Sequence, residues 1–242
     1  MMSKDEIFKE PGTDSAPFEF NDAVAAVFPD MLRRSIPGYD ASIEAISTLA
    51  RRYVTPGSRC YDLGCSLGAA TLAMRRNIPG DGCEIVAVDL APAMVERCQL
   101  LIDADDADIP VTVEAADVRA VSIENASMVV LNYTLQFLPV DDRVELIRNI
   151  YNGLNEGGVL VLSEKVADDD PAVESLLVDL HHEFKRANDY SDLEIARKRT
   201  ALDNVLIPET TSVHLDRLAA AGFDHRSVWL KHFNFVSIIA IR

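Results

Sequence analysis

A turn with two glycines, placed between an apolar run and a helical pattern, is the first candidate for a binding site. It has the sequence Tyr61-Asp-Leu-Gly-Cys-Ser-Leu-Gly68. Gly64 allows a tight backbone turn, and Gly68 allows close approach where the helix begins. Because glycines are common in such turns, they are weak evidence by themselves. The carboxylate of Asp62 adds chemistry, since it can hold the amino group of a ligand that carries an amino acid.

An acidic residue ends the next apolar run. Asp89 stands 25 residues after Gly64, which is the spacing at which a carboxylate accepts hydrogen bonds from ribose hydroxyls. The alternative is an ordinary helix N-cap ahead of Pro92. One residue can fill both roles, and the spacing favours ribose.

Polar residues also follow the third and fourth apolar runs. Asp117 comes after the third run, where a carboxylate can bind an adenine amino group and the backbone N–H of Val118 a ring nitrogen. Taken alone, Asp117 is equally well a solvated loop residue; together with Asp62 and Asp89 it favours adenine. Asn132 ends the fourth run and is expected to face the reactive part of the ligand.

The spacing Asp-x-Gly-x-x-x-Gly from Asp62 to Gly68 resembles the first motif of enzymes that use S-adenosylmethionine (SAM). It departs from that motif at Ser66, which stands where the middle glycine is usual. The fourth run ends in Asn132-Tyr-Thr134 and not in the Asn-Pro-Pro-Tyr pattern of amino-group methylation. The sequence therefore indicates a SAM site without indicating that reaction.

One arginine is predicted to lie on an apolar helix face. Ser191-Asp-Leu-Glu194 is a capping box that opens a helix. Its apolar stripe consists of Ile195, Arg199, Leu202 and Leu206, whereas Arg197 and Lys198 are expected to point elsewhere. A half-buried guanidinium needs an anionic partner. A structural salt bridge is the more frequent arrangement, and bidentate capture of a ligand carboxylate is the functional one.

The elements that must position these residues alternate along the chain. Strands are predicted at 59–63, 84–88, 111–115, 127–131 and 159–162, with helices at 69–76, 92–102 and 143–154. This alternation predicts a parallel sheet with crossover helices. The runs 225–231 and 233–241 are too close together for a crossover helix, so they should form an antiparallel hairpin. The predicted class is α/β, a methyltransferase-type Rossmann fold with a mostly parallel seven-stranded sheet.

Two helical additions lie outside this pattern, within one domain that spans 1–242. The first is an N-terminal extension at about 18–50, with a helix predicted at Asp22–Ser35. The second is an insertion at about 171–206, opened by Pro171 after three aspartates. Its first helix places Val173, Leu176, Leu177, Leu180 and Phe184 on one face. Additions of this kind usually cover an active site or form a dimer interface.

Composition restricts the partners. The 242 residues carry 39 acidic and 23 basic side chains, a formal net charge of −16 that opposes phosphate binding. No stretch is long and apolar enough for a membrane span, and the first residues are polar and acidic. The sequence predicts no metal site. His181-His-Glu183 is followed by Phe184-Lys-Arg and so does not form a His-Glu-x-x-His motif, and the cysteines have no paired spacing. Buried reduced thiols at Cys60, Cys65, Cys83 and Cys98 are expected, in a cytoplasmic protein.

Over nearly its whole length the chain resembles the carboxy-S-adenosylmethionine synthases. The resemblance rests on several runs, which begin at Val27, Ser35, Tyr61, Glu124, Leu135, Leu162, His181, Lys198 and Phe233. The Gly-Cys-Ser-Leu-Gly form of the turn, with Ser66 in place of glycine, is the form that this family shows. The departure from the general SAM motif therefore supports the narrower assignment.

The resemblance implies a conversion of SAM and prephenate into carboxy-S-adenosylmethionine (carboxy-SAM), phenylpyruvate and water. The product would supply the carboxymethyl group for a wobble uridine in tRNA, without direct contact between this chain and nucleic acid. The resemblance also implies a homodimer, and it makes the downstream tRNA carboxymethyltransferase a candidate partner. By position, Arg199 matches the residue that binds the product carboxylate. The other matching ligand contacts are Tyr39, Gly64, Cys65, Ser66, Asp89, Leu90, Asp117, Val118 and Asn132.

Two other functions fit the same fold. An ordinary small-molecule methyltransferase would share the SAM site, but a simple methyl donor offers no extra carboxylate for Arg199. A non-catalytic SAM-binding partner of a tRNA-modifying enzyme would show no turnover with prephenate. No pattern in the sequence identifies the prephenate-binding residues.

Overall fold

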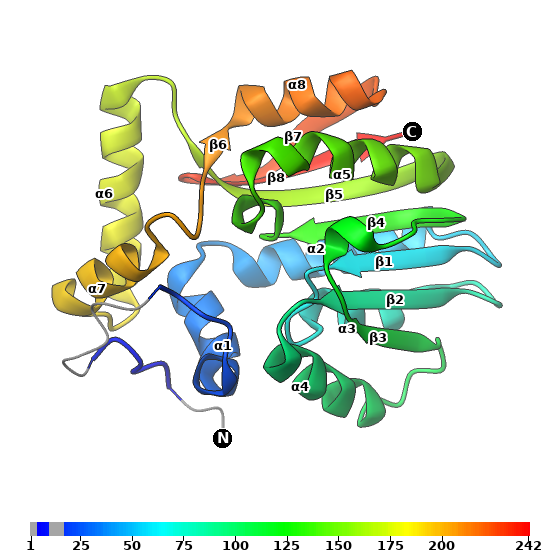
Figure 1. The fold of residues 1–242 in the computed structure, drawn as a ribbon, viewed down its shortest axis with the longest axis horizontal. Coiled ribbons are helices and arrows are strands. Elements are labelled where there is room, and N and C mark those ends of the chain that lie inside the picture. Colours follow the sequence, from blue (N-terminus) through cyan, green and yellow to red (C-terminus); the bar gives the residue numbers. More distant parts are fainter. Residues whose placement is uncertain (1–3, 10–16) are drawn as a thin grey trace.

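The computed structural model describes residues 4–9 and 17–242, and a twisted sheet forms its centre (Figure 1). The strands are β1 (Arg59–Leu63), β2 (Glu84–Asp89), β3 (Val111–Ala115), β4 (Ala126–Asn132), β5 (Leu154–Ala167), β6 (Glu209–Thr210), β7 (His225–His232) and β8 (Phe235–Ile241). Their order is β3-β2-β1-β4-β5-β8-β7, with the two-residue β6 beside β5. Strands β1 to β5 are parallel, and β8 is antiparallel to both β5 and β7. The predicted fold class and hairpin are confirmed.

Helices cover both faces of the sheet, which explains why its central strands are apolar throughout. The crossover and covering helices are α2 (Tyr39–Tyr53), α3 (Ala69–Arg75), α4 (Pro92–Asp103), α5 (Val140–Gly153) and α8 (Thr211–Ala221). In β4, Val129 and Leu131 pack with α5, while Met128 and Val130 pack with α2 and α3. Alternate residues of one strand thus enter two separate cores.

The predicted strands lie where the structure has them, with one consequential difference. Strand β5 continues well beyond 159–162 and ends at Ala167. Its extension carries Lys165 to the same edge of the sheet as the ends of β1, β2 and β4. The covering helix α8 and the short strand β6 were not predicted.

The two additions lie together at one end of the molecule. They contain α1 (Asp22–Ser35), α6 (Pro171–Ala187) and α7 (Asp192–Leu202), and Figure 1 shows α6 standing beside the sheet with α7 below it. The predicted apolar face of α6 is only partly covered, since Val173 is 40% and Leu176 is 56% exposed. The side of α6 that is buried carries His181 and Lys185 instead.

The N-terminal segment fastens α7 to α1. The backbone N–H of Asp5 donates to the carboxylate of Asp30 on α1 at 2.7 Å, and its own carboxylate accepts the hydroxyl of Tyr190. The guanidinium of Arg34 lies 3.9 Å from the centre of the Tyr190 ring. Further along, the N–H of Phe18 donates to the carbonyl of Ala201 at 2.9 Å. These contacts hold the first described residues against α1, α7 and the residue Tyr190 just before α7.

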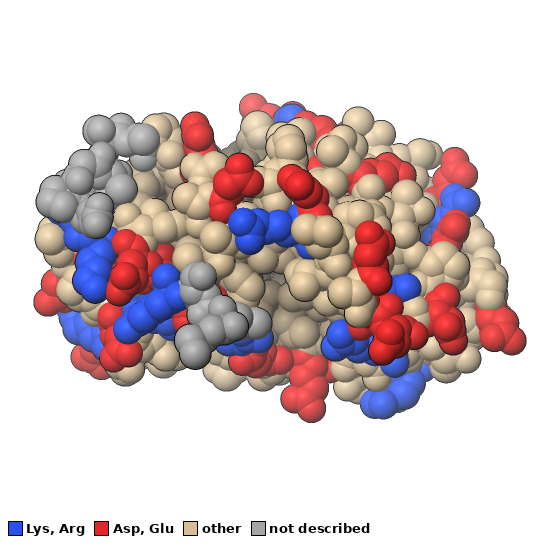
Figure 2. Space-filling model, turned by 90° about the horizontal axis from the view of Figure 1, so that it is seen from below, with Lys and Arg blue, Asp and Glu red and all other residues tan. Residues whose placement is uncertain are grey.

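The surface carries charges of both signs. On the face that Figure 2 shows, Lys and Arg side chains lie among Asp and Glu and form no continuous basic patch. The middle of this face is hollowed and lined by uncharged residues. In the part of the chain that the structure describes, no helix is long and apolar enough to cross a membrane.

Candidate active site

A pocket of about 640 Å³ lies where the carboxyl ends of the parallel strands meet the two additions. This is the usual place for a ligand in an open α/β sheet. Ten of the eleven residues predicted for the site line it. They are Tyr39, Asp62, Gly64, Cys65, Ser66, Asp89, Leu90, Asp117, Val118 and Asn132.

Neighbouring side chains lie so close to the two glycines of the turn that neither position has room for a Cβ atom. Gly64 has a φ of +86°, and a Cβ there would come within 2.3 Å of the Thr134 side chain. A Cβ at Gly68 would come within 2.8 Å of Cys98 Sγ. Ser66 has a φ of +48°, in the left-handed region that glycine adopts without strain. The structure therefore explains both the two glycines and why a third is usual at the position of Ser66.

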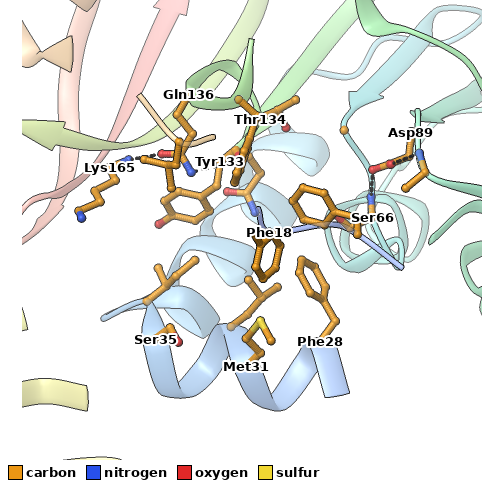
Figure 3. Close-up of a pocket in the computed structure, with 18 of the residues that line it drawn as sticks. Phe18, Phe28, Met31, Ser35, Ser66, Asp89, Tyr133, Thr134, Gln136 and Lys165 are labelled. Carbon is orange, nitrogen blue, oxygen red and sulfur yellow. Dashed lines mark hydrogen bonds between the residues drawn. The ribbon is translucent and has the colours of Figure 1, made fainter. Parts of the chain in front are cut away.

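The carboxylate of Asp89 is held in place by two backbone N–H groups. Oδ2 accepts from Ser66 and Oδ1 accepts from Ala91, both at 2.9 Å (Figure 3). Burial raises the pKa of Asp89, while these two donors act in the opposite direction. Helix α4 is capped at Ala91, so Asp89 lies before the N-cap and is not the N-cap itself. Each oxygen keeps a lone pair for a further donor.

The carboxylate of Asp62 is almost completely buried beneath the turn. Thr71 Oγ1 donates to its Oδ2 at 2.6 Å. Burial raises the pKa of Asp62 to about 6. A ligand ammonium bound beside it would stabilise the charged form and lower this pKa again.

Two further side chains that were predicted to contact the ligand differ in the hydrogen bonds that they already form. Asp117 lines the pocket, but Arg119 Nε lies 2.9 Å from its Oδ1 and Arg119 Nη2 2.5 Å from its Oδ2. Donation from Arg119 lowers the pKa of Asp117. By contrast, Oδ1 of Asn132 is buried and has no hydrogen-bond partner among the described residues. Because Asn132 lines the pocket, this acceptor is available to a donor that enters it.

The end of the pocket away from Asp89 is basic, and the sequence did not predict this. Lys165, Lys185 and Lys198 line it, together with His181. In Figure 3, Lys165 lies on the opposite side from Ser66 and Asp89. Mainly through burial, the pKa of Lys185 is lowered to about 7 and that of Lys198 to about 8.

The imidazole of His181 stays neutral in this surrounding. Burial, followed by the charge of Lys185, lowers its pKa to about 2. Its Nε2 lies 2.8 Å from the carbonyl oxygen of Ser35, so the neutral ring carries its proton on Nε2.

The prediction that Arg199 lies half-buried on an apolar face is wrong. The side chain is exposed, does not line the pocket and forms no hydrogen bond or ion pair within residues 4–9 and 17–242. Helix α7 ends at Leu202, so Leu206 does not share its helical phase. The buried face contains Lys198, which was expected to point elsewhere. Arg199 still lies close enough to lower the pKa of Lys165 by its charge.

Aromatic rings line much of the rest of the pocket. Phe20 contacts Phe18, Phe28 and Phe137 edge to face, with centroids 5.1 to 6.0 Å apart. At the basic end, the Phe235 ring meets His181 at 4.9 Å and Tyr133 at 6.0 Å. Phe18 and Phe20 precede α1, a segment in which the sequence shows neither a periodic pattern nor a motif. In the described part of the chain, no three His, Cys, Asp or Glu side chains are grouped to hold a metal ion.

The sheet order and the contents of the strand-end pocket define the class of SAM-dependent methyltransferase-like enzymes. A sequence profile of the methyltransferase domain family matches residues 60–158. An O-methyltransferase family protein from Burkholderia thailandensis has the same fold, with a TM-score of 0.67 and 18% identity over 91% of this chain and 59% of that one. Human N-acetylserotonin methyltransferase in complex with SAM matches with a TM-score of 0.61 and 18% identity, over 91% of this chain and 55% of its own.

Sequence relatives narrow the class. The carboxy-S-adenosyl-L-methionine synthase of Trichlorobacter lovleyi is 54% identical over 98% of both chains. That of Vibrio parahaemolyticus is 55% identical over 98% of this chain and 97% of its own. The chain belongs to the carboxy-S-adenosyl-L-methionine synthase family and is an enzyme of the SAM-using class.

Proposed function

We propose that the chain converts SAM and prephenate into carboxy-SAM, phenylpyruvate and water. The observation that carries this proposal is identity of 54–55% along the whole chain to enzymes named for carboxy-SAM synthesis. The methyltransferase profile stops at residue 158, before the basic end of the pocket begins. The full-length match extends past that point and includes both additions.

SAM would occupy the end of the pocket that holds Asp89. Its ribose would bind Asp89 beside Leu90, its adenine would lie against Val118 and Asp117, and its amino-acid part would meet the turn above Asp62. The methyl group would then face Asn132, whose free Oδ1 supports this placement. Tyr39, Gly64, Cys65 and Ser66 complete the proposed contacts.

The chemistry follows from the charges of the substrates. A sulfonium acidifies its methyl group, and aromatisation drives the loss of CO2 and hydroxide from prephenate. The hydroxide takes the methyl proton and becomes water, and the resulting sulfur ylide captures CO2 through a new carbon–carbon bond. Phe18, Phe20 and Phe137 line the pocket, and with both substrates bound their rings would keep bulk water from protonating the ylide.

Mass spectrometry of the products tests the proposal. With both substrates, we expect a species heavier than SAM by one CO2, together with phenylpyruvate, and neither product when prephenate is left out. Accumulation of S-adenosylhomocysteine with a methylated acceptor would identify an ordinary methyltransferase. SAM binding without any turnover would identify a binding protein.

Arg199 remains our proposed partner of the product carboxylate, although it must turn in from the solvent to reach it. Arg199→Ala should weaken carboxy-SAM binding about tenfold or more while SAM binds as before, because only carboxy-SAM carries the extra charge. Arg199→Lys should restore only part of the affinity, since an ammonium lacks the planar fork. Calorimetric titration of both ligands measures the difference.

The melting temperature separates this role from a structural one. Because the Arg199 side chain is exposed, its removal should leave the melting temperature unchanged, as should the matched exposed variant Arg51→Ala. Equal losses of SAM and carboxy-SAM affinity in Arg199→Ala would contradict the carboxylate-binding role.

The proposal extends to assembly and pathway. We propose a cytoplasmic homodimer, whose product serves the enzyme that carboxymethylates a tRNA wobble uridine. Four free, buried cysteines support a reducing compartment. Exposed apolar side chains on α6 and α7, among them Val173, Leu176 and Leu193, support a subunit interface there. Sedimentation at several concentrations measures the assembly.

Direct binding of tRNA should be weak. With a net charge of −16 and the mixed face of Figure 2, few phosphates could be neutralised. We therefore expect no submicromolar affinity for full-length tRNA and only a shallow salt dependence in a filter-binding assay. Tight binding with a steep salt slope would mean that a basic surface exists on another face.

A further inference from the structure

Three lysines, two of them buried and one partly buried, form a cationic cluster at the end of the pocket opposite Asp89. They come from three different elements: Lys165 from β5, Lys185 from α6 and Lys198 from α7. Lys185 and Lys198 are only 8% and 7% exposed. Burying several like charges together costs stability unless an anion compensates them.

The protein supplies little compensation. Lys198 Nζ donates to Ser35 Oγ at 2.9 Å and lies 3.9 Å from the carboxylate of Asp5. Glu174 is the acid near Lys165. Lys185 is faced by Lys198 and Lys165, and no acidic group of the described chain acts on Lys185 itself.

The same surroundings leave Lys185 without a partner. Its Nζ has no hydrogen bond or ion pair within the described chain. A turn away on α6, His181 is neutral and already bound to the Ser35 carbonyl, and burial followed by the charge of Lys185 lowers the pKa of His182. The ammonium of Lys185 is therefore available to a group that enters the pocket.

An apolar wall lines the same pocket as this cluster. Ile36, Tyr39, Tyr133 and Phe235 pack together there. A ligand that fits has a ring for this wall and negative charge for the lysines. Its reacting atom would point toward Asn132, where the proposed SAM methyl group lies.

We propose that Lys165, Lys185 and Lys198 form the binding site for the second substrate, an alicyclic or aromatic molecule with two carboxylates. This inference rests on the proposed function, in which prephenate is that dicarboxylate. One carboxylate binds at Lys185 and Lys198, and the other lies nearer Lys165 and the SAM methyl group. The lysines hold and orient the dianion, and the CO2 it releases is formed next to the acceptor carbon.

Calorimetry on the full-length protein saturated with S-adenosylhomocysteine tests the site, since that ligand has no methyl group to react. Lys185→Met and Lys165→Met should each weaken prephenate binding tenfold or more. Both should bind S-adenosylhomocysteine within about twofold of the wild type. Lys231→Met, which removes an exposed lysine from β7, is the matched control and should change neither affinity. Unchanged prephenate affinity in both pocket variants would overturn the proposal.

A structural role for the lysines would give a different result. Because methionine replaces an ammonium that has no described partner, Lys185→Met should melt at the same temperature as the wild type or higher. A lowered melting temperature, with equal loss of both ligands, would show that Lys185 serves the fold and would contradict the proposal.

Proton uptake gives a second readout. With a pKa of about 7, Lys185 is mostly neutral at pH 8 and should gain a proton when a dianion binds beside it. Titrations at pH 8 in buffers of different ionisation enthalpy should show this uptake in the wild type and less of it in Lys185→Met. Affinity should also fall as the pH rises above 7. Binding without proton uptake and without pH dependence would count against Lys185.

Measuring prephenate binding and carboxy-SAM formation separately distinguishes a failure of the lysine site from a failure of the proposed reaction. If prephenate binds through the lysines but no carboxy-SAM forms, the reaction is wrong and the site stands. If prephenate does not bind, phthalate is the second probe, because it presents two carboxylates on a ring. Phthalate binding that Lys185→Met abolishes would support the site, and no binding of either probe would overturn it.

Discussion

Asp89→Ala is expected to weaken SAM binding about a hundredfold or more. The Asp89 carboxylate is already oriented by the N–H groups of Ser66 and Ala91, both at 2.9 Å, so it needs no rearrangement to accept two ribose hydroxyls. Hydrogen bonds to a charged group contribute roughly 1.5 to 3 kcal/mol each, so losing two costs about 3 kcal/mol at least. That corresponds to about two powers of ten in affinity. Calorimetric titration with SAM measures the loss.

Two variants make this result specific. Asp108→Ala removes an exposed carboxylate elsewhere on the chain and should leave SAM affinity unchanged. Asp89→Asn keeps the shape, but its amide nitrogen cannot accept one of the two backbone donors, so its affinity should be intermediate. SAM affinity within threefold of the wild type in Asp89→Ala would remove Asp89 from the site.

The strand-end residues could be predicted because short-range rules position them. Asp62, Asp89 and Asn132 each lie at or near the end of an apolar run, and parallel strands bring such ends to one edge of a sheet. Hydrophobic pattern and sequence spacing were therefore sufficient for these residues. Sequence spacing does not predict side-chain pairing, such as the ion pair between Arg119 and Asp117 that the structure shows.

The basic end of the pocket could not be predicted in the same way. Its lysines come from β5, α6 and α7, and only tertiary packing decides that they converge. On α7, the apolar pattern placed Arg199 in the stripe because it lies at helical spacing between Ile195 and Leu202, and the stripe was continued to Leu206, beyond the end of the helix. A stripe built on Ile195 and Ala201 would have selected Lys198. The error is one helical position, which turns the face by about 100°.

The remaining pocket residues lie in segments that have no periodic hydrophobic pattern. Phe18 lines the pocket, and its N–H donates to the carbonyl of Ala201, more than 180 residues later in the chain. No local pattern encodes such a contact. In the additions, capping residues and hydrophobic spacing could predict the helices but not which helix faces line the pocket.

A buried arginine joins two walls of the pocket and carries the other large expected effect. Arg143 is completely buried on α5. Its Nη2 donates to the carbonyls of Gln136, Leu138 and Ile207 at 2.9 to 3.2 Å. Its Nη1 lies 2.5 Å from the carboxylate of Glu209. The residue thus ties the turn after β4 to the segment that follows α7.

The neighbouring acid Glu164 does not replace Glu209 as the counter-charge. It is fully buried and accepts the N–H groups of Leu135 and Gln136 at 3.0 and 2.9 Å. Burial raises the pKa of Glu164 to about 8, so it is largely neutral at pH 7. The charge of Arg143 is therefore balanced chiefly by Glu209.

Arg143→Met should lower the melting temperature by on the order of 10 °C. Breaking a buried ion pair costs about 3 to 5 kcal/mol, and in a protein of this size each kcal/mol shifts the melting temperature by roughly 2 to 4 °C. Arg148→Met is the matched control on the same helix, because Arg148 is exposed and, among the described residues, pairs only with Glu145, at 2.6 Å. Its loss should shift the melting temperature by less than about 2 °C. SAM affinity should fall in Arg143→Met as well, because Gln136 and Leu138 line the pocket. Equal melting temperatures for the two variants would show that the buried network does not hold these walls together.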